Sequence, residues 1–273
     1  MRRLLAPLLL VLSLLPASVW AHDYWLAPER FELSVGQSLR VDLRLGGHFE
    51  AESSRPYQAE RTKSFVLVTA SETVDLREHA IDGATPVLEG LALPEAGAGL
   101  VAMERNWVDI KLADAKFTEY LEHEGLTSIA RLRDRQGHRP IERECYTRSL
   151  KSLVHVGDSD ESTTMHDRVL GHRLEIVLLD DPRGLEPGDE LRARVLWRGK
   201  PLAKARVTAH HRAAADQGKV HTLTARTDAD GRVSLPVQAK GAWLLRLVHM
   251  VPCRGCSHTD WESYWTSFSF AID

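Results

Sequence analysis

His22 is the residue whose position could support the most specific chemistry. Residues 1–21 have the pattern of a secretory signal peptide, with two arginines, an apolar run and the small-residue cleavage site Val19-Trp20-Ala21. Cleavage after Ala21 would make His22 the first residue of the mature protein. Its free α-amine and its ring could then chelate one metal ion, because both groups lose a proton to a metal near neutral pH. The sequence therefore predicts a periplasmic protein with a metal-binding amino terminus.

His48 and His249 are the other two histidines that the sequence favours as ligands. His249 lies at the end of a strand expected over 243–250, on the apolar face, whereas Arg246 lies on the opposite face. It is therefore either a core histidine with satisfied hydrogen bonds or a ligand held at the rim of a sheet. His48 follows two glycines at the end of an early strand, a common place for a functional side chain, although a solvated loop histidine would look the same.

Together, His22, His48 and His249 form the predicted metal site. Nitrogen ligands of this kind suit divalent transition metals such as copper and nickel, with copper(II) favoured in the general order of affinity. The prediction requires the end of the C-terminal strand to pack beside the mature amino terminus.

The remaining histidines and the cysteines carry weaker signals. The pair His210-His211 points to opposite faces of a strand and cannot easily share one metal, and His123 is expected on the surface of a helix. Cys253-Arg254-Gly255-Cys256 is a single C-x-x-C, which in an exported protein favours a loop disulfide over a metal pair or a redox dithiol. Cys145 then has no cysteine partner.

The composition is that of a soluble globular protein and argues against several function classes. Of the 273 residues, 43% are hydrophobic and 27% charged, and the formal net charge is −3. A mildly acidic exported protein is a poor nucleic-acid binder. No apolar run after the signal is long enough to cross a membrane. The sequence has no G-x-S-x-G, H-E-x-x-H, P-loop or dinucleotide motif, so no enzymatic activity is predicted.

The elements that must position these residues are mainly strands. Alternating apolar and polar residues predict two half-buried antiparallel strands at 31–35 and 39–45. Helices are expected at 114–124 and 128–135. From about residue 170, short strands separated by Gly and Pro turns are typical of an immunoglobulin-like β-sandwich.

The predicted fold is therefore mainly β, with two β-sandwich-like domains after the signal peptide of residues 1–21. The N-terminal β-rich domain covers 22–168 and carries the short helical insertion. The immunoglobulin-like β-sandwich domain covers 169–273. Within it, Asp228-Ala229-Asp230-Gly231 is typical of a hairpin turn.

Six segments of the sequence carry a resemblance to a known family. They are Ala21–Leu26, Tyr120–Leu126, Lys151–Gly157, Thr227–Arg232, Trp243–Met250 and Asp260–Trp265. On these segments the chain resembles a family of exported bacterial proteins that is catalogued as a domain of unknown function and described as the periplasmic component of cobalt or nickel uptake systems. The resemblance covers essentially the whole mature chain. It implies a mostly β fold, the handling of transition metals including cobalt, and a membrane metal-uptake transporter or outer-membrane receptor as partner.

The preferred function is thus the periplasmic binding of a divalent transition metal, nickel/cobalt or copper, for uptake or delivery. Two alternatives stay open. A copper-dependent mono-oxygenase can also use an N-terminal histidine chelate, and it would need an open coordination position beside an exposed substrate-binding face. A flat aromatic surface near His22 would favour it, and Tyr24 and Trp25 are the only hint. A structural or adhesive β-sandwich module would carry its histidines incidentally.

Overall fold

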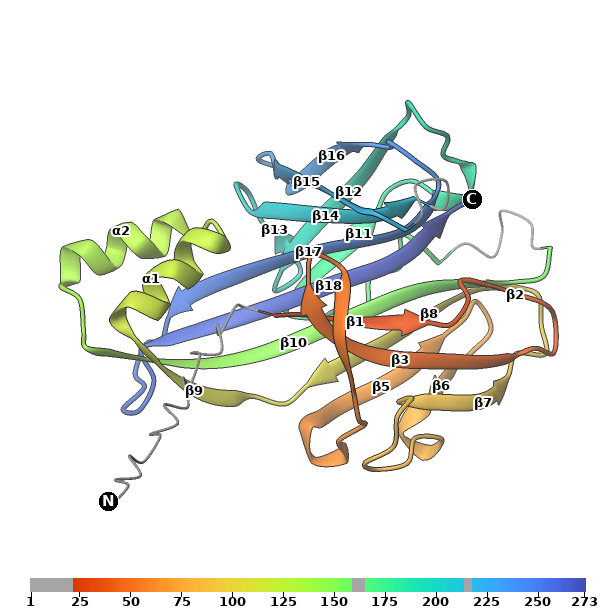
Figure 1. Cartoon of the computed structure of the whole chain (residues 1–273), viewed down its shortest axis with the longest axis horizontal. Helices are drawn as coiled ribbons and strands as arrows, with labels where there is room; N and C mark the ends of the chain where they lie inside the picture. The colour runs from red at the N-terminus through yellow and green to blue at the C-terminus, as the bar shows by residue number, and fades with distance from the viewer. Residues whose placement is uncertain (1–21, 159–164, 214–217) are drawn as a thin grey trace, which may run out of the picture.

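The computed structural model of the chain describes residues 22–158, 165–213 and 218–273 (Figure 1). The signal peptide predicted over residues 1–21, with its cleavage after Ala21, lies outside these described residues. The described part is mainly β, as the alternating pattern predicted, with two α-helices beside one end of the long strands. Neither of these helices is long and apolar enough to span a membrane.

Three sheets make up the described part of the chain. The first contains, in order, β1 (Asp23–Pro28), β3 (Ser38–Gly47) and β4 (Glu50–Arg55), with β7 (Leu88–Ala92) beside β3. The large second sheet contains, in order, β15 (Val220–Arg226), β14 (Arg206–Ala213), β17 (Gly241–Pro252), β18 (Trp261–Ile272), β10 (Ile141–Val156), β8 (Gly97–Arg105), β5 (Thr62–Val68) and β6 (Thr73–Asp75). In the same sheet, β2 (Glu32–Leu33) and β9 (Val108–Ala113) also pair with β10.

The third sheet and the helices complete the described elements. The third sheet contains, in order, β11 (Leu174–Leu178), β12 (Glu190–Trp197) and β13 (Lys200–Pro201), with β16 (Arg232–Pro236) beside β12. The helices are α1 (Asp114–His123), α2 (Thr127–Gln136) and the short 3-10 segments η1 (Ala59–Arg61), η2 (Leu76–Glu78) and η4 (Pro182–Gly184).

The parallel pairing of β10 with β18 joins the two halves of the chain. It runs from Glu144 opposite Trp261 to Ser152 opposite Ser269. Parallel neighbours need a long crossover connection, and here the whole segment between β10 and β18 provides it. One sheet therefore crosses the boundary predicted between residues 168 and 169, so the segments 22–168 and 169–273 share a sheet instead of forming two separate ones.

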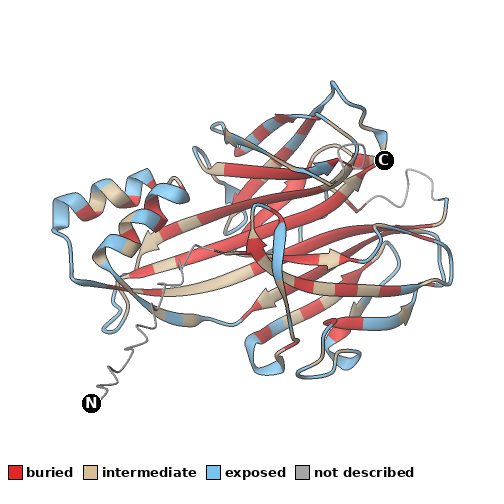
Figure 2. Cartoon of the chain, in the orientation of Figure 1, coloured by how far each residue is buried: buried red, intermediate tan, exposed pale blue. Residues whose placement is uncertain are grey.

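Each face of the large sheet is covered by a different layer. Leu174, Ile176 and Leu191 of the third sheet pack in one core with Leu245 and Phe268, which makes the C-terminal half a β-sandwich. On the N-terminal side, strands of the first sheet pack in a second core against β5, β8 and β10. Figure 2 shows buried residues along most of β17, β18 and the second half of β10, so these long strands form the interior of the molecule.

Two local sequence predictions were wrong about which strands pair with each other. The strand predicted at 31–35 is reduced to β2, and it pairs with β10 and not with β3. The predicted hairpin turn at 228–231 connects β15 to β16, which pair with β14 and β12 in different sheets. Asp228 accepts hydrogen bonds from the backbone N–H groups of Asp230 and Arg232, so a tight turn forms there although the strands separate. Alternation identifies a strand, but it does not identify its neighbour.

Helix α1 covers one end of the large sheet. Phe117, Tyr120 and Leu121 form its buried face, as the spacing predicted. They pack on Trp261 and Trp265 of β18. The helix ends before Gly125, whose φ of +66° is a conformation that favours glycine.

A buried ion pair links the large sheet to β11. Lys151 of β10 is fully buried, and its Nζ lies 3.1 Å from Oε1 of Glu175, which is 1% exposed. We predict that Lys151→Met lowers the free energy of unfolding by about 3–5 kcal/mol, because it leaves a buried carboxylate without its cation. Urea denaturation measures this change. The double variant Lys151→Met/Glu175→Gln should recover part of the loss, and equal stabilities of Lys151→Met and wild type would contradict the pairing.

Glu144 predicts a pH dependence of stability. Its carboxylate is buried between α1 and β18, and it accepts hydrogen bonds from the hydroxyls of Tyr120 and Ser263. Burial raises the pKa of Glu144 to about 7, against the opposing effects of these two hydroxyls and of Arg148. The folded state therefore binds this proton more tightly than the unfolded state, whose carboxyl titrates near 4.5.

The contribution of Glu144 to stability is thus fully present below about pH 4.5 and is lost as the pH rises through about 7. We predict that wild type loses about 3 kcal/mol more stability than Glu144→Gln between pH 4.5 and pH 8. Urea unfolding of both proteins across this range checks the difference, which cancels the titration of other groups. Parallel stability curves would show that Glu144 has an ordinary pKa.

Candidate functional site

Four histidines meet at one cavity of about 640 Å³, which lies between the first sheet, the end of α1 and the large sheet. We call it the histidine cavity. Its histidines are His22, His48, His123 and His210. The rest of its lining consists of Asp23, Gly47, Glu50, Glu52, Arg206, Thr208, Thr222, Thr224 and Arg246.

The β1–β3 pairing brings the first two histidines together. Asp23 lies opposite Gly46, so His22 reaches the end of β3 just before His48. The ring of His22 is held by Glu52 of β4, with 2.9 Å between His22 Nε2 and Glu52 Oε2. Two residues that are 26 positions apart in the sequence thus share one rim of the cavity.

The turn that carries His48 is closely constrained. His48 and Phe49 both have positive φ, 53° and 61°, as in the type I′ turns that join two-residue hairpins. Such values are uncommon for residues other than glycine and persist where the surroundings fix them. Here Phe49 is buried against Trp25, with ring centroids 5.5 Å apart, and its carbonyl accepts a hydrogen bond from Arg212. The anchored Phe49 positions His48 over the cavity.

The other two histidines come from α1 and β14. His123 is the last residue of α1, and its Nδ1 lies 2.9 Å from Oε1 of Glu124. His210 is 2% exposed, and its Nδ1 lies 2.8 Å from the hydroxyl of Thr222 on β15. The ring of His48 lies between them, with its centroid 5.8 Å from that of His210 and 6.5 Å from that of His123.

A buried arginine lies at the base of this group. Arg246 of β17 pairs with Asp23 of β1, with 2.5 Å between Arg246 Nε and Asp23 Oδ1. It also forms a bidentate salt bridge with Glu124, in which one terminal nitrogen donates to Oε1 at 2.7 Å and the other donates to Oε2 at 2.8 Å. Burial alone would lower the pKa of Arg246, but the carboxylates of Glu124 and Asp23 raise it above its usual value. The guanidinium therefore stays charged, and two carboxylates share its one positive charge.

Burial also controls the protonation of the groups around this arginine. Burial raises the pKa of Asp23, against the attraction of Arg246. The pKa of Glu124 is lowered, because Arg246 and His123 outweigh the effect of burial. Burial, and secondly Arg246, lower the pKa of His210 to about 3, so this ring is neutral at physiological pH. A neutral imidazole is the form that binds metals.

The structure brings together two of the three predicted ligands. His22 and His48 both line the histidine cavity. His249 does not lie there: its ring packs on Trp197 of β12, with centroids 4.6 Å apart, in the layer between the large sheet and the third sheet. Because side chains alternate along β17, Arg246 faces the cavity and His249 faces away from it. The same alternation had placed these two residues on opposite faces.

Two histidines of the cavity were missed by sequence reasoning. His123 is exposed, as its expected place on a helix surface implied, but there it ends α1 beside the buried Glu124 and lines the cavity. The prediction that His210 and His211 point apart is confirmed, since His211 stacks on Trp243 and contacts Gln238. The sequence signal that could have identified His210 is the polar face of β14. On this face Thr208 and His210 alternate with the apolar Val207 and Ala209 of the opposite face.

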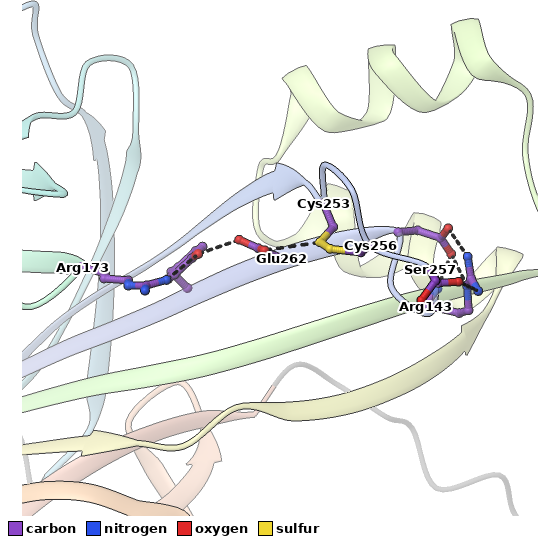
Figure 3. The surroundings of a disulfide bond; sticks show 8 residues. Arg143, Arg173, Cys253, Cys256, Ser257 and Glu262 are labelled. Carbon is purple, nitrogen blue, oxygen red and sulfur yellow. Dashed lines mark hydrogen bonds and ion pairs between the residues drawn. A yellow bond between two sulfur atoms is a disulfide. The ribbon is translucent and has the colours of Figure 1, made fainter.

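The side chains that line the histidine cavity do not bring three ligand atoms close to a single point. In the described residues, the only three metal-ligating side chains with ligand atoms within 4.8 Å of one another are Cys253, Cys256 and Glu262. Figure 3 shows that the two cysteines form a disulfide on the loop after β17, as predicted. Their sulfurs are joined to each other, so this group offers no thiolate in the oxidised protein.

Comparisons with known proteins give a family and no function. Residues 19–251 match the model of a family described as a domain of unknown function, DUF4198. No curated protein matches the chain.

Similarity to solved structures is distant. A tetra-tandem repeat in the extending region of a large adhesion protein is 11% identical over 93% of this chain and 50% of that chain, with a TM-score of 0.23. Trypsin-activated alpha-2-macroglobulin from Escherichia coli is 10% identical over 92% of this chain and 16% of that chain, with a TM-score of 0.22. The chain thus spans half or less of these structures.

The turn beside His48 predicts contrasting effects of two adjacent substitutions. A Cβ on Gly46 would lie 1.9 Å from the backbone oxygen of Glu50, whereas a Cβ on Gly47 would meet nothing within 4 Å. We therefore expect Gly46→Ala to lower the free energy of unfolding by about 1–3 kcal/mol, because the backbone must move. Gly47→Ala is the matched control and should stay close to wild type in urea unfolding. Equal effects of the two variants would contradict this geometry.

Proposed function

The chain belongs to the family of DUF4198 domains, and we propose from the geometry of the histidine cavity that it binds a divalent transition metal, copper or nickel/cobalt, in the periplasm for uptake or delivery. The metal is bound cargo in this proposal, and the protein is not an enzyme. The observation that carries it is the meeting of His22 and His48 with His123 and His210 in one cavity.

The cavity has the chemistry of a cation site. Four imidazoles offer nitrogen ligands of the kind that copper, nickel and cobalt prefer. Asp23, Glu50 and Glu52 add three carboxylates to the lining, against the two guanidiniums of Arg206 and Arg246. The burial of His210 keeps its ring neutral and able to bind.

Cleavage after Ala21 would complete the site. It frees the α-amine of His22, which adds a second nitrogen on the same residue and closes a chelate ring. The family match begins at residue 19, so a mature chain starting at His22 retains nearly all of the matched segment. His48 and His123 are exposed, so their side chains can rotate toward an ion beside His22, whereas the buried His210 is fixed by its hydrogen bond with Thr222.

Trp25 does not provide the aromatic surface that would favour copper mono-oxygenase chemistry. A flat aromatic surface near His22 would favour an oxygenase, and Trp25 was one of the two residues that suggested it. Trp25 is 3% exposed and packs against Phe49 and Leu244. It therefore supports the His48 turn and presents no surface to a substrate.

A metal titration of matched amino termini tests this function. We predict that the chain starting at His22 binds copper(II) or nickel(II) at least about tenfold more tightly than a chain with one additional alanine before His22, because the extra residue removes the amine chelate. His48→Ala and His210→Ala should each weaken binding by a similar factor. Isothermal titration calorimetry with copper(II), nickel(II) and cobalt(II) gives the dissociation constants.

Two histidine variants outside the cavity serve as controls. His79→Ala removes an exposed histidine at the end of η2, and His249→Gln replaces the ring on the opposite face of β17. Both should bind the metal as wild type does. Equal affinity of the two amino termini would refute the amine chelate, and a loss of affinity in His249→Gln would refute the assignment of the cavity.

A further inference from the structure

A second, smaller pocket adjoins the histidine cavity and has different chemistry. Its volume is about 230 Å³, and it lies between β1, α1, β9, β10 and β18. His22 lines both pockets. The walls of the smaller one are mostly aromatic and aliphatic, with Tyr24, Tyr146 and Trp265 among them. We call it the aromatic pocket.

Arg148 is held in this pocket by rings instead of by an acid. Its guanidinium carbon lies 4.4 Å from the ring centroid of Tyr24, 4.5 Å from that of Tyr146 and 5.3 Å from that of Trp265. Its Nε is buried and has no hydrogen-bond partner. Over the described ranges no carboxylate forms an ion pair with it. A guanidinium fixed by stacking, with free N–H groups, matches the planar fork of a carboxylate.

Glu144 supplies a second unpartnered group on the same wall. Its side chain is 1% exposed, and Oε1 takes the hydrogen bonds from Tyr120 and Ser263. The other oxygen, Oε2, is buried with no partner. Buried polar atoms are nearly always paired, so an orphaned oxygen on a residue that lines a pocket indicates a missing partner. Glu144 and Arg148 are four residues apart on β10 and therefore lie on one face, separated along the strand.

We propose that the aromatic pocket binds a small aromatic carboxylic acid with a hydroxyl group at its far end. The carboxylate pairs with Arg148, the flat ring packs against Trp265 and its aromatic neighbours, and the hydroxyl bonds to Oε2 of Glu144. The two orphaned groups lie at different positions along β10, which suits a ligand with polar groups at opposite ends of a ring. A phenolic hydroxyl can donate or accept, so it suits either protonation state of Glu144.

Calorimetry with three related probes tests the proposal. The mature chain is titrated in the presence of EDTA, so that the outcome does not depend on the proposed metal site. The probes are 4-hydroxyphenylacetate, phenylacetate, which lacks the hydroxyl, and 4-methylphenol, which lacks the carboxylate. We expect 4-hydroxyphenylacetate to bind and each of the others to bind at least about tenfold more weakly, since each leaves a buried group unpaired.

Variants of Arg148 identify the carboxylate partner. Arg148→Met keeps a long apolar side chain between the rings, so it should fold and lose the preference for 4-hydroxyphenylacetate over 4-methylphenol. Arg198→Met is the matched control, because Arg198 also stacks on a tryptophan, Trp197, but outside the pocket. It should bind all three probes as wild type does.

Each remaining outcome of this experiment overturns the proposal. The first is the absence of heat with 4-hydroxyphenylacetate while the chain is folded by circular dichroism. The second is equal affinity for the three probes, which would indicate a merely apolar pocket. The third is a carboxylate preference that survives in Arg148→Met, because another cation would then hold the carboxylate.

Discussion

One buried guanidinium, that of Arg246, connects three segments that are far apart in the sequence. It pairs with Asp23 at the start of β1 and with Glu124 at the end of α1, while its own backbone belongs to β17. Breaking a buried pair of this kind is costly, because the charge left behind has no water to solvate it. The start of β1, the end of α1 and the large sheet are therefore fixed relative to one another, and the histidine cavity lies where they meet.

The alternation of side chains along the long strands then divides the chemistry between two faces. On β17, Arg246 faces the cavity, while Leu245, Leu247 and His249 face the sandwich core. On β10, Glu144 and Arg148 face the aromatic pocket. The two sites can therefore lie side by side on a sheet whose opposite face packs in the core shared with the third sheet, where the Lys151–Glu175 ion pair is also buried.

The sequence predicted the elements better than it predicted their neighbours. The alternation of β3 and the spacing of α1 were sufficient to locate both, because these patterns are local. The parallel β10–β18 pair could not be predicted, since its partners are more than 100 residues apart and periodicity carries no information on pairing. In the site, His22 was identified by its predicted cleavage and His48 by its glycine turn. His123 and His210 were missed because only the tertiary fold brings the exposed end of α1 and the buried face of β14 to the same cavity.

A metal-soaked crystal of the chain that starts at His22 gives the most direct test of the account. The anomalous difference map at the nickel or copper absorption edge locates the ion without any assumption about its ligands. We expect one strong peak in the histidine cavity, within bonding distance of His22 and of at least one of His48, His123 and His210. A peak only at the Cys253–Cys256 loop, or no peak at full soaking, would contradict it.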